Sequence, residues 1–118
     1  MRVKRITAAG RERSANPIFR GTVESQTAVG EEDSRDLRLS EVAFKDGGRN
    51  TWHMHSCDQI LVVTSGSGMV ATEHEQRDIN VGDVVHIKAG ERHWHGAKAS
   101  STMGHITITL VGGQATWG

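Results

Sequence analysis

The sequence predicts an all-β fold of the sandwich or barrel type, and three observations support this class. From residue 37 onward the chain consists of short apolar runs, which glycines separate at intervals typical of β-hairpins. No segment places apolar residues at helical spacing over three turns. The 118 residues include 14 glycines and one proline, which suits a single small domain with many turns.

The first 36 residues are mostly polar, and we expect them to form an N-terminal arm beside a barrel of residues 37–118. Two stretches of the arm, 3–7 and 18–23, alternate well enough to form edge strands. The segments 9–16 and 30–36 are rich in charged and small residues and are expected loops. The barrel strands are expected at residues 37–45, 59–64, 68–72, 83–88, 92–97 and 103–111.

The composition argues against several classes of protein. Lysine plus arginine and aspartate plus glutamate number 14 each, so the net charge is zero, which disfavours binding to nucleic acid or to a membrane surface. The longest apolar run, residues 60–63, is far shorter than the roughly 18 residues that a membrane-spanning helix needs. A single cysteine excludes a disulfide framework, and the basic start of the chain lacks the apolar stretch of a signal peptide. We therefore expect a cytoplasmic protein.

Histidine is the most informative residue type in the sequence. Four of the seven histidines form two His-x-His pairs, His53 with His55 and His93 with His95. Because alternate residues of a strand point to the same face, each pair directs two imidazoles to one side. Gln59 shares the parity of the first pair if the strand continues unbroken to it. A barrel that closes around these strands brings together His53, His55, Gln59, His93 and His105.

Such a cluster predicts a site for one divalent metal ion. Imidazole is the commonest protein ligand for these metals, and three ring nitrogens with one amide oxygen leave positions open for water or substrate. Alternatives remain for single residues: Gln59 as an ordinary polar residue, His95 as a core histidine, and His105 as a wall residue rather than a base. Cys57 would line the cavity by parity, but it falls in an expected bend, so a small buried thiol is favoured. The apolar walls of the cavity are expected from residues such as Leu61, Val63, Val85 and Ile87.

Two motifs give the chain a resemblance to the cupins. The first cupin motif, G-x5-H-x-H-x3-E-x6-G, fits Gly47, His53, His55, Gln59 and Gly66 in every spacing, with glutamine in place of the usual glutamate. The resemblance covers residues 37–110 and implies a double-stranded β-helix, or jelly-roll, barrel.

The second cupin motif, G-x5-P-x-G-x2-H-x3-N, fits Gly82, Gly90 and His93. Lys88 stands where proline is usual and Ala97 where asparagine is usual. Both departures affect a turn and a strand end rather than a ligand. The two motifs together imply that one divalent metal is held by His53, His55, Gln59 and His93.

Within the cupins, the chain is similar to a bacterial His-His-Gln-His subgroup. That subgroup includes manganese-dependent hydroxynitrile lyases and proteins loosely labelled carboxymuconolactone-decarboxylase-like. In the lyases a histidine on the strand after the second motif acts as general base, and the resemblance assigns this role to His105. Asn50 departs from the pattern, because the lyases carry a threonine there.

Gln59 also bears on the class of reaction. Three neutral imidazoles and a neutral amide leave the full charge of a divalent ion uncompensated, which strengthens its action as a Lewis acid. Without an anionic ligand, the higher oxidation states of oxygen chemistry are less stabilised. We therefore favour lyase or isomerase chemistry over an iron-dependent dioxygenase, with manganese or iron in the cell. Nickel, zinc or cobalt are possible ions in the purified protein.

A non-enzymatic cupin, which binds or senses a ligand through its metal, is the principal alternative function. The sensing barrel of a transcription regulator is a weaker one, since the chain has no helix-turn-helix segment or basic patch. The expected partners are a small-molecule substrate or ligand and a second copy of the chain. A homodimer is expected because a small barrel has little core and open sheet edges need cover.

Overall fold

The computed structural model describes residues 1–117, in which all regular structure except one short 3-10 helix is β-strand. The helix, η1, spans Ala8–Gly10. The strands are β1 (Glu12–Arg13), β2 (Phe19–Val29), β3 (Leu37–Asn50), β4 (His53–His55), β5 (Gln59–Thr72), β6 (Gln76–Asn80), β7 (Val84–Ile87), β8 (His93–Ala97), β9 (Met103–Leu110) and β10 (Ala115–Trp117). No helix in residues 1–117 is long and apolar enough to cross a membrane.

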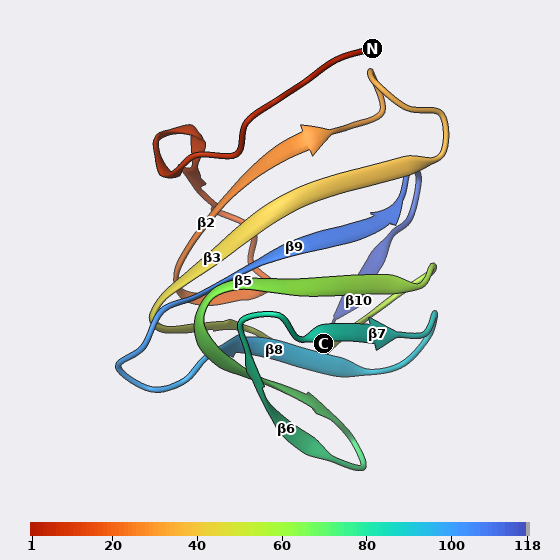
Figure 1. Cartoon of the computed structure of the whole chain (residues 1–118). Helices are drawn as coiled ribbons and strands as arrows, with labels where there is room; N and C mark the ends of the chain where they lie inside the picture. The colour runs from red at the N-terminus through yellow and green to blue at the C-terminus, as the bar shows by residue number, and fades with distance from the viewer. Residues whose placement is uncertain (118) are drawn as a thin grey trace.

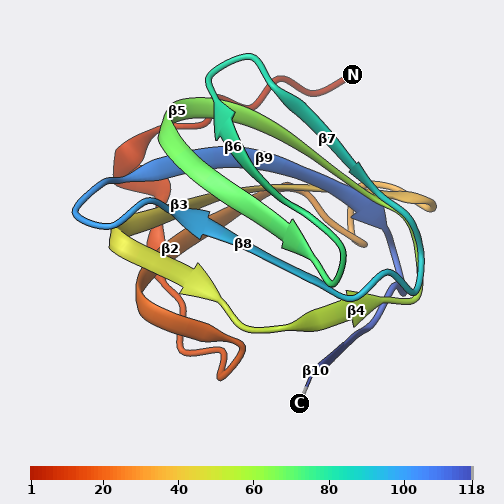
Figure 2. The ribbon, with the colours of Figure 1, turned by 90° about the horizontal axis from the view of Figure 1, so that it is seen from below.

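The strands form one antiparallel sheet that curls into a barrel. Its order is β1-β2-β3-β9-β5-β8-β4-β10, with β6 and β7 both paired to β5. β3 also pairs with β8 through Arg49 and Gly96, which closes the barrel. Figure 1 shows β2, β3 and β9 as one layer and β8 in the other, with β5 curving from the first to the second. In the view from below, β8 and β4 lie in front of β3 and β9 (Figure 2). The predicted all-β class and barrel architecture are confirmed.

Two glycines permit the bend and the closure. β5 pairs with β9 and β7 before its bend, and with β6 and β8 after it. At the bend Gly66 has a φ of +67°, and a Cβ there would overlap the carbonyl of Thr102. At the closure a Cβ on Gly96 would overlap the side chain of Arg49. Any larger residue at either position would push neighbouring strands apart.

An apolar core fills the barrel beside the polar cavity described below. Phe44, which is fully buried, borders both regions. Burial of the core side chains supplies the main driving force for closing the barrel. The core consists of Val23, Phe44, Leu61, Val63, Val70, Ile79, Ile87, Ala97 and Met103.

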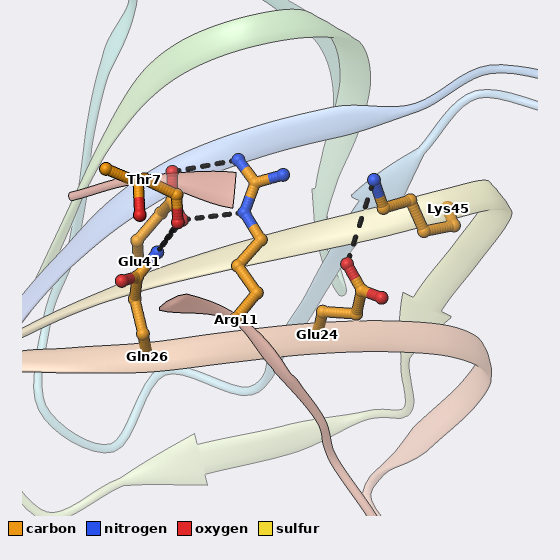
Figure 3. A network of polar contacts seen from close by, with 6 residues as sticks. All are labelled: Thr7, Arg11, Glu24, Gln26, Glu41 and Lys45. Atoms are coloured by element: carbon orange, nitrogen blue, oxygen red, sulfur yellow. Dashed lines mark hydrogen bonds and ion pairs between the residues drawn. The ribbon is translucent and has the colours of Figure 1, made fainter. Parts of the chain in front are cut away.

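A buried ion pair holds the N-terminal arm against the barrel (Figure 3). Glu41 is 6% exposed and, by strand alternation, lies on the opposite face of β3 from Val42, which lines the cavity. Arg11 donates to both carboxylate oxygens at 2.8 and 3.0 Å, and these bonds lower the pKa of Glu41. Gln26 donates to the same carboxylate at 2.8 Å and to the carbonyl of Thr7 at 2.7 Å. The arm is therefore anchored by side chains over the outer face of β2 and β3.

Some predicted elements differ in the structure. Residues 3–7 form no strand, because this stretch is held by side-chain bonds such as that from Lys4 to the carbonyl of Thr27. The expected loop 9–16 instead contains β1. The expected strands 59–64 and 68–72 are one strand, since the glycines between them permit a bend without ending the ladder. The division into arm and barrel at residue 37 stays a prediction, although β2 pairs with β3 along most of its length.

Candidate metal centre

Three histidines converge inside the barrel from two neighbouring strands. His53 on β4 pairs directly with His93 on β8, and their ring centroids are 4.2 Å apart. His55, two residues along β4, lies on the same face, 5.0 Å from the ring of His53. Ligand atoms of the three rings all lie within 4.8 Å of one another, so the cluster could hold a metal ion.

Backbone carbonyls fix the orientation of two of these rings. Nδ1–H of His53 donates to the carbonyl of Thr51 at 2.6 Å, and Nδ1–H of His93 donates to the carbonyl of Glu91 at 2.8 Å. In a neutral imidazole the other nitrogen is then an acceptor, so both Nε2 lone pairs remain available. Nε2 of His55 is buried and has no hydrogen-bond partner. A buried polar atom without a partner is costly unless something else binds it.

Gln59 supplies an oxygen beside these nitrogens. It is 5% exposed, and its Oε1 lies 3.2 Å from Nε2 of His93. The strand does not continue unbroken from His55 to Gln59, because the chain bends at residues 56–57 and β5 begins at Gln59 itself. The parity rule therefore did not apply, yet the bend returns the amide to the cluster.

Burial keeps the three imidazoles neutral. Desolvation lowers the pKa of His53, and it lowers the pKa of both His55 and His93 to about 4. Neutral imidazole is the form that binds a metal. The neutral rings, the unpartnered nitrogen of His55 and the facing amide oxygen of Gln59 together fit a divalent cation in chemistry and in charge.

Behind this cluster, His95 and His105 form a hydrogen-bonded pair whose tautomers are set by Asn50. Oδ1 of Asn50 accepts from the backbone N–H of His95 at 2.8 Å, so its Nδ2 donates to Nε2 of His95 at 3.1 Å. The proton of His95 is then on Nδ1, which donates to Nε2 of His105 at 3.1 Å. Nδ1–H of His105 in turn donates to the hydroxyl of Thr107 at 3.1 Å. Both rings are neutral and buried, at 3% and 0% exposure.

His95 therefore stands between His105 and the histidine cluster. The ring centroid of His95 is 4.9 Å from that of His105 and 5.8 Å from that of His53. Desolvation lowers the pKa of His105 to about 4, and it lowers the pKa of His95 well below its usual 6.5. Both interpretations left open for His95 describe part of the structure, since the residue lines the cavity and is also a buried histidine with both ring nitrogens hydrogen-bonded.

His53, His55, His95 and His105 line a cavity of about 330 Å³. The expectation that Leu61, Val63 and Ile87 line it is wrong, because these side chains are in the apolar core. Val85, on β7, is partly buried and packs against the same apolar core. The walls instead come from the inner faces of β2, β3 and β9, where hydroxyl groups alternate along the strands. Sequence alternation separates the two faces of β3 but does not say which one is inside, so Arg38 and Ser40 were missed as lining residues.

The remaining candidates lie at the rim or outside. Cys57 is half-buried and lines the cavity beside Gly113, rather than being fully buried. His86 is exposed, and its Nε2 donates a hydrogen bond to the carboxylate of Asp58 at 2.8 Å. His74 is exposed on the turn between β5 and β6.

Comparison with known protein families identifies the family of this chain. A family model described as a cupin domain matches residues 40–109, which is more than half of the sequence. The chain belongs to the cupin family. In this cupin, the residues that occupy the motif positions His53, His55 and His93 are the three that converge.

This cupin is similar to an enzyme and to solved structures of the family. It is 34% identical to an (R)-mandelonitrile lyase of Granulicella tundricola, over 99% of this chain and 92% of the lyase. A cupin-like protein of Thermotoga maritima superposes with a TM-score of 0.83 at 33% identity, covering 89% of this chain and 82% of the other. A polyketide cyclase of Streptomyces resistomycificus shares the fold, with a TM-score of 0.79, 16% identity, and coverage of 92% and 80%.

Proposed function

We propose that this cupin is a divalent-metal-dependent lyase for a small oxygen-bearing substrate, with the metal held by His53, His55, Gln59 and His93. The observation that carries the proposal is the set of acceptor atoms that face one another without a hydrogen between them. Nε2 of His93 and Oε1 of Gln59 are 3.2 Å apart, and Nε2 of His55 is buried without a partner. A cation accepts a lone pair from each of these atoms at once.

The neutral ligand set points to the chemistry. A divalent ion held there supplies a Lewis acid that stabilises negative charge on a substrate oxygen. Manganese or iron is the proposed ion in the cell, since an amide oxygen is a hard ligand, while nickel, zinc or cobalt can load during purification.

His105 is the proposed base, acting together with His95. Nε2 of His105 accepts a hydrogen bond from His95. It can take up a substrate proton only if this hydrogen bond is broken, so protonation of His105 also changes the hydrogen bonding of His95. Their burial keeps both neutral near pH 7 and therefore able to accept a proton. In a cyanohydrin cleavage, the hydroxyl proton passes to this pair, the O–H electrons form the carbon–oxygen double bond, and the carbon–nitrile bond breaks so that cyanide leaves with its bonding electrons.

The similarity to an (R)-mandelonitrile lyase supports this reaction class and provides the first assay. Protein stripped with a chelator and reloaded with Mn(II) is expected to release benzaldehyde from (R)-mandelonitrile. His93→Ala abolishes the release, whereas His86→Ala, a histidine outside the cavity, retains it. Release that survives both chelation and His93→Ala contradicts the proposal, as does the absence of cleavage of any cyanohydrin with Mn, Fe, Co, Ni or Zn.

A non-enzymatic ligand-binding role is the second candidate, and one observation favours it. Both ring nitrogens of His105 are already hydrogen-bonded inside the protein, one to His95 and one to Thr107. If the metal-loaded protein binds small ligands without converting them, this role replaces the lyase.

We further propose that the chain acts as a homodimer. Residues 1–7 are extended but pair with no strand among residues 1–117, and Val3 is 91% exposed. An unpaired extended segment is a natural element for a two-fold contact. Light scattering at micromolar concentration is expected to give twice the mass of the chain, and a monomer mass contradicts the proposal.

A further inference from the structure

The cavity has an unusual balance of charge. Arg38 is the only lining residue with a permanent charge among residues 1–117, and neither aspartate nor glutamate lines the cavity. Arg38 forms no ion pair with any described residue. Its one side-chain hydrogen bond there, from Nη2 to the hydroxyl of Thr27 at 3.2 Å, leaves most of its five donors for another partner.

Strand register brings Arg38 close to the histidine end of the cavity. Arg38 on β3 pairs with Thr109 on β9. β9 and β5 are antiparallel, and Ile108 on β9 lies opposite Ile60 on β5. The next residue along β9, Thr109, is therefore level with Gln59. Adjacent strands are about 4.8 Å apart, so the Cα atoms of Gln59 and Arg38 are separated by roughly 10 Å across two strand spacings. A molecule of a few carbon atoms can span the remaining space between their side chains.

The wall between these two ends is rich in hydroxyl groups. They stand on three adjacent strands, each at a half-buried position. Hydroxyls both donate and accept, so they suit a ligand with several oxygen atoms better than a hydrocarbon one. The hydroxyl-bearing lining residues of these strands are Ser25, Thr27, Ser40, Thr107 and Thr109.

We propose that the cavity selects a small carboxylate that carries a hydroxyl or carbonyl oxygen at its other end, with Arg38 binding the carboxylate. This inference rests on the proposed function for the end of the ligand that reaches His53, His55 and His93. The planar guanidinium matches a carboxylate with two parallel hydrogen bonds, and the hydroxyl of Thr27 lies 3.2 Å from its Nη2. A neutral nitrile or aldehyde leaves Arg38 without a counter-charge, so the preferred substrate differs in charge from mandelonitrile, which serves as an assay substrate.

Two matched ligand pairs test the carboxylate preference: lactate against lactamide, and 3-hydroxybutyrate against 3-hydroxybutyramide. Each pair keeps the hydroxyl and the carbon chain and changes only the charge. Binding is measured by calorimetry on Mn(II)-loaded protein and by NMR titration of metal-free protein. Because Arg38 belongs to the chain, the preference is expected in both forms, at about tenfold or more for at least one pair.

Variants at Arg38 identify the residue responsible. Arg38→Gln is expected to abolish the preference while leaving the Mn(II) content unchanged, and Arg38→Lys to retain part of it. Arg35→Gln is the matched control, because Arg35 is exposed, as Arg38 is, but lies outside the cavity and pairs with Asp36. The inference is overturned if the acid and the amide bind equally, if neither acid binds, or if the preference survives Arg38→Gln.

These outcomes separate the inference from the proposed function. Protein that binds Mn(II) and cleaves cyanohydrins but shows no acid preference refutes the role of Arg38 alone. Protein that binds no metal but prefers the acids in an Arg38-dependent way refutes the metal centre and supports the anion site.

Discussion

The side-chain oxygen of Gln59 lies 3.2 Å from Nε2 of His93, although neither atom carries a hydrogen to share. The proton of His93 is on Nδ1, bonded to the carbonyl of Glu91. Two buried acceptors at hydrogen-bond distance repel each other unless a hydrogen-bond donor or a cation lies beside them. This contact therefore connects the fold to the proposed metal chemistry, and several predictions depend on it.

Replacing Gln59 by glutamate is expected to strengthen metal binding and weaken catalysis. A carboxylate neutralises part of the charge of the ion, so a substrate oxygen is stabilised less. We expect Gln59→Glu to reduce turnover of (R)-mandelonitrile by about tenfold, a change of roughly 1.4 kcal/mol in the barrier. Mn(II) affinity measured on the same preparation is expected to rise. Turnover equal to that of the parent protein shows that the neutral amide is not needed.

Removing His55 is expected to separate metal binding from stability. Its Nε2 is buried without a partner, so the imidazole costs free energy in the metal-free protein. We expect His55→Ala to change the free energy of unfolding of the metal-free protein by no more than about 1 kcal/mol. The rise in melting temperature on addition of Mn(II) is expected to vanish. A loss of several kcal/mol without metal would show that His55 is a packing residue instead.

Replacing Asn50 by aspartate is expected to change the tautomer of His95. The amide nitrogen of Asn50 donates to Nε2 of His95, and a carboxylate oxygen in that place accepts instead. The proton of His95 is then drawn to Nε2, and the bond from its Nδ1 to His105 is lost or reversed. Nitrogen NMR of the metal-free protein reports this change directly, since protonated and unprotonated ring nitrogens differ widely in shift. An unchanged Nδ1–H tautomer contradicts the assigned role of Asn50.

The metal-free protein is expected to lose stability on mild acidification. Burial lowers the pKa of His105 from 6.5 to about 4, so the unfolded chain binds this proton at a higher pH than the folded chain. The free energy of unfolding therefore falls as the pH drops through 6.5, and this contribution levels off below about 4. The full effect is about 3 kcal/mol, from roughly 1.4 kcal/mol per pKa unit.

Urea titrations between pH 7.5 and 5 measure this effect. His105→Gln removes one of five histidines with a lowered pKa and is expected to reduce the slope by the share of that residue. His74→Gln removes an exposed histidine from a turn and serves as the control, with the slope of the parent protein. Equal slopes for the His105 variant and the parent would contradict the assignment.

Much of the fold could be predicted because strand alternation and glycine placement are local properties. The strands around His93 and His105 were expected within a few residues of their observed bounds. The strand expected at residues 3–7 does not form. This part of the chain is held by long side chains that bind backbone carbonyls, rather than by the backbone hydrogen bonds of a ladder. β10 was missed because its pairing with β4 joins segments about 60 residues apart.

The candidate site was predictable in its histidines and less so in its walls. His53 and His55 face one way by alternation, and the cupin spacing relates them to His93. Gln59 reaches the cluster through a bend that alternation does not describe. Alternation assigns Arg38 to one of the two faces of β3, but it does not say which face lines the cavity. Only the closed barrel shows that the face with Arg38 is the lining face. That these residues bind a metal stays a prediction.

Metal content tests the central proposal most directly. Protein purified without a metal-affinity tag, stripped with a chelator and titrated with Mn(II) is expected to bind one ion per chain, measured by elemental analysis and electron paramagnetic resonance. His53→Ala and His93→Ala are expected to bind none, and His86→Ala to bind one. Undetectable binding of Mn, Fe, Co, Ni and Zn by the parent protein, or equal binding by His93→Ala, would contradict the account.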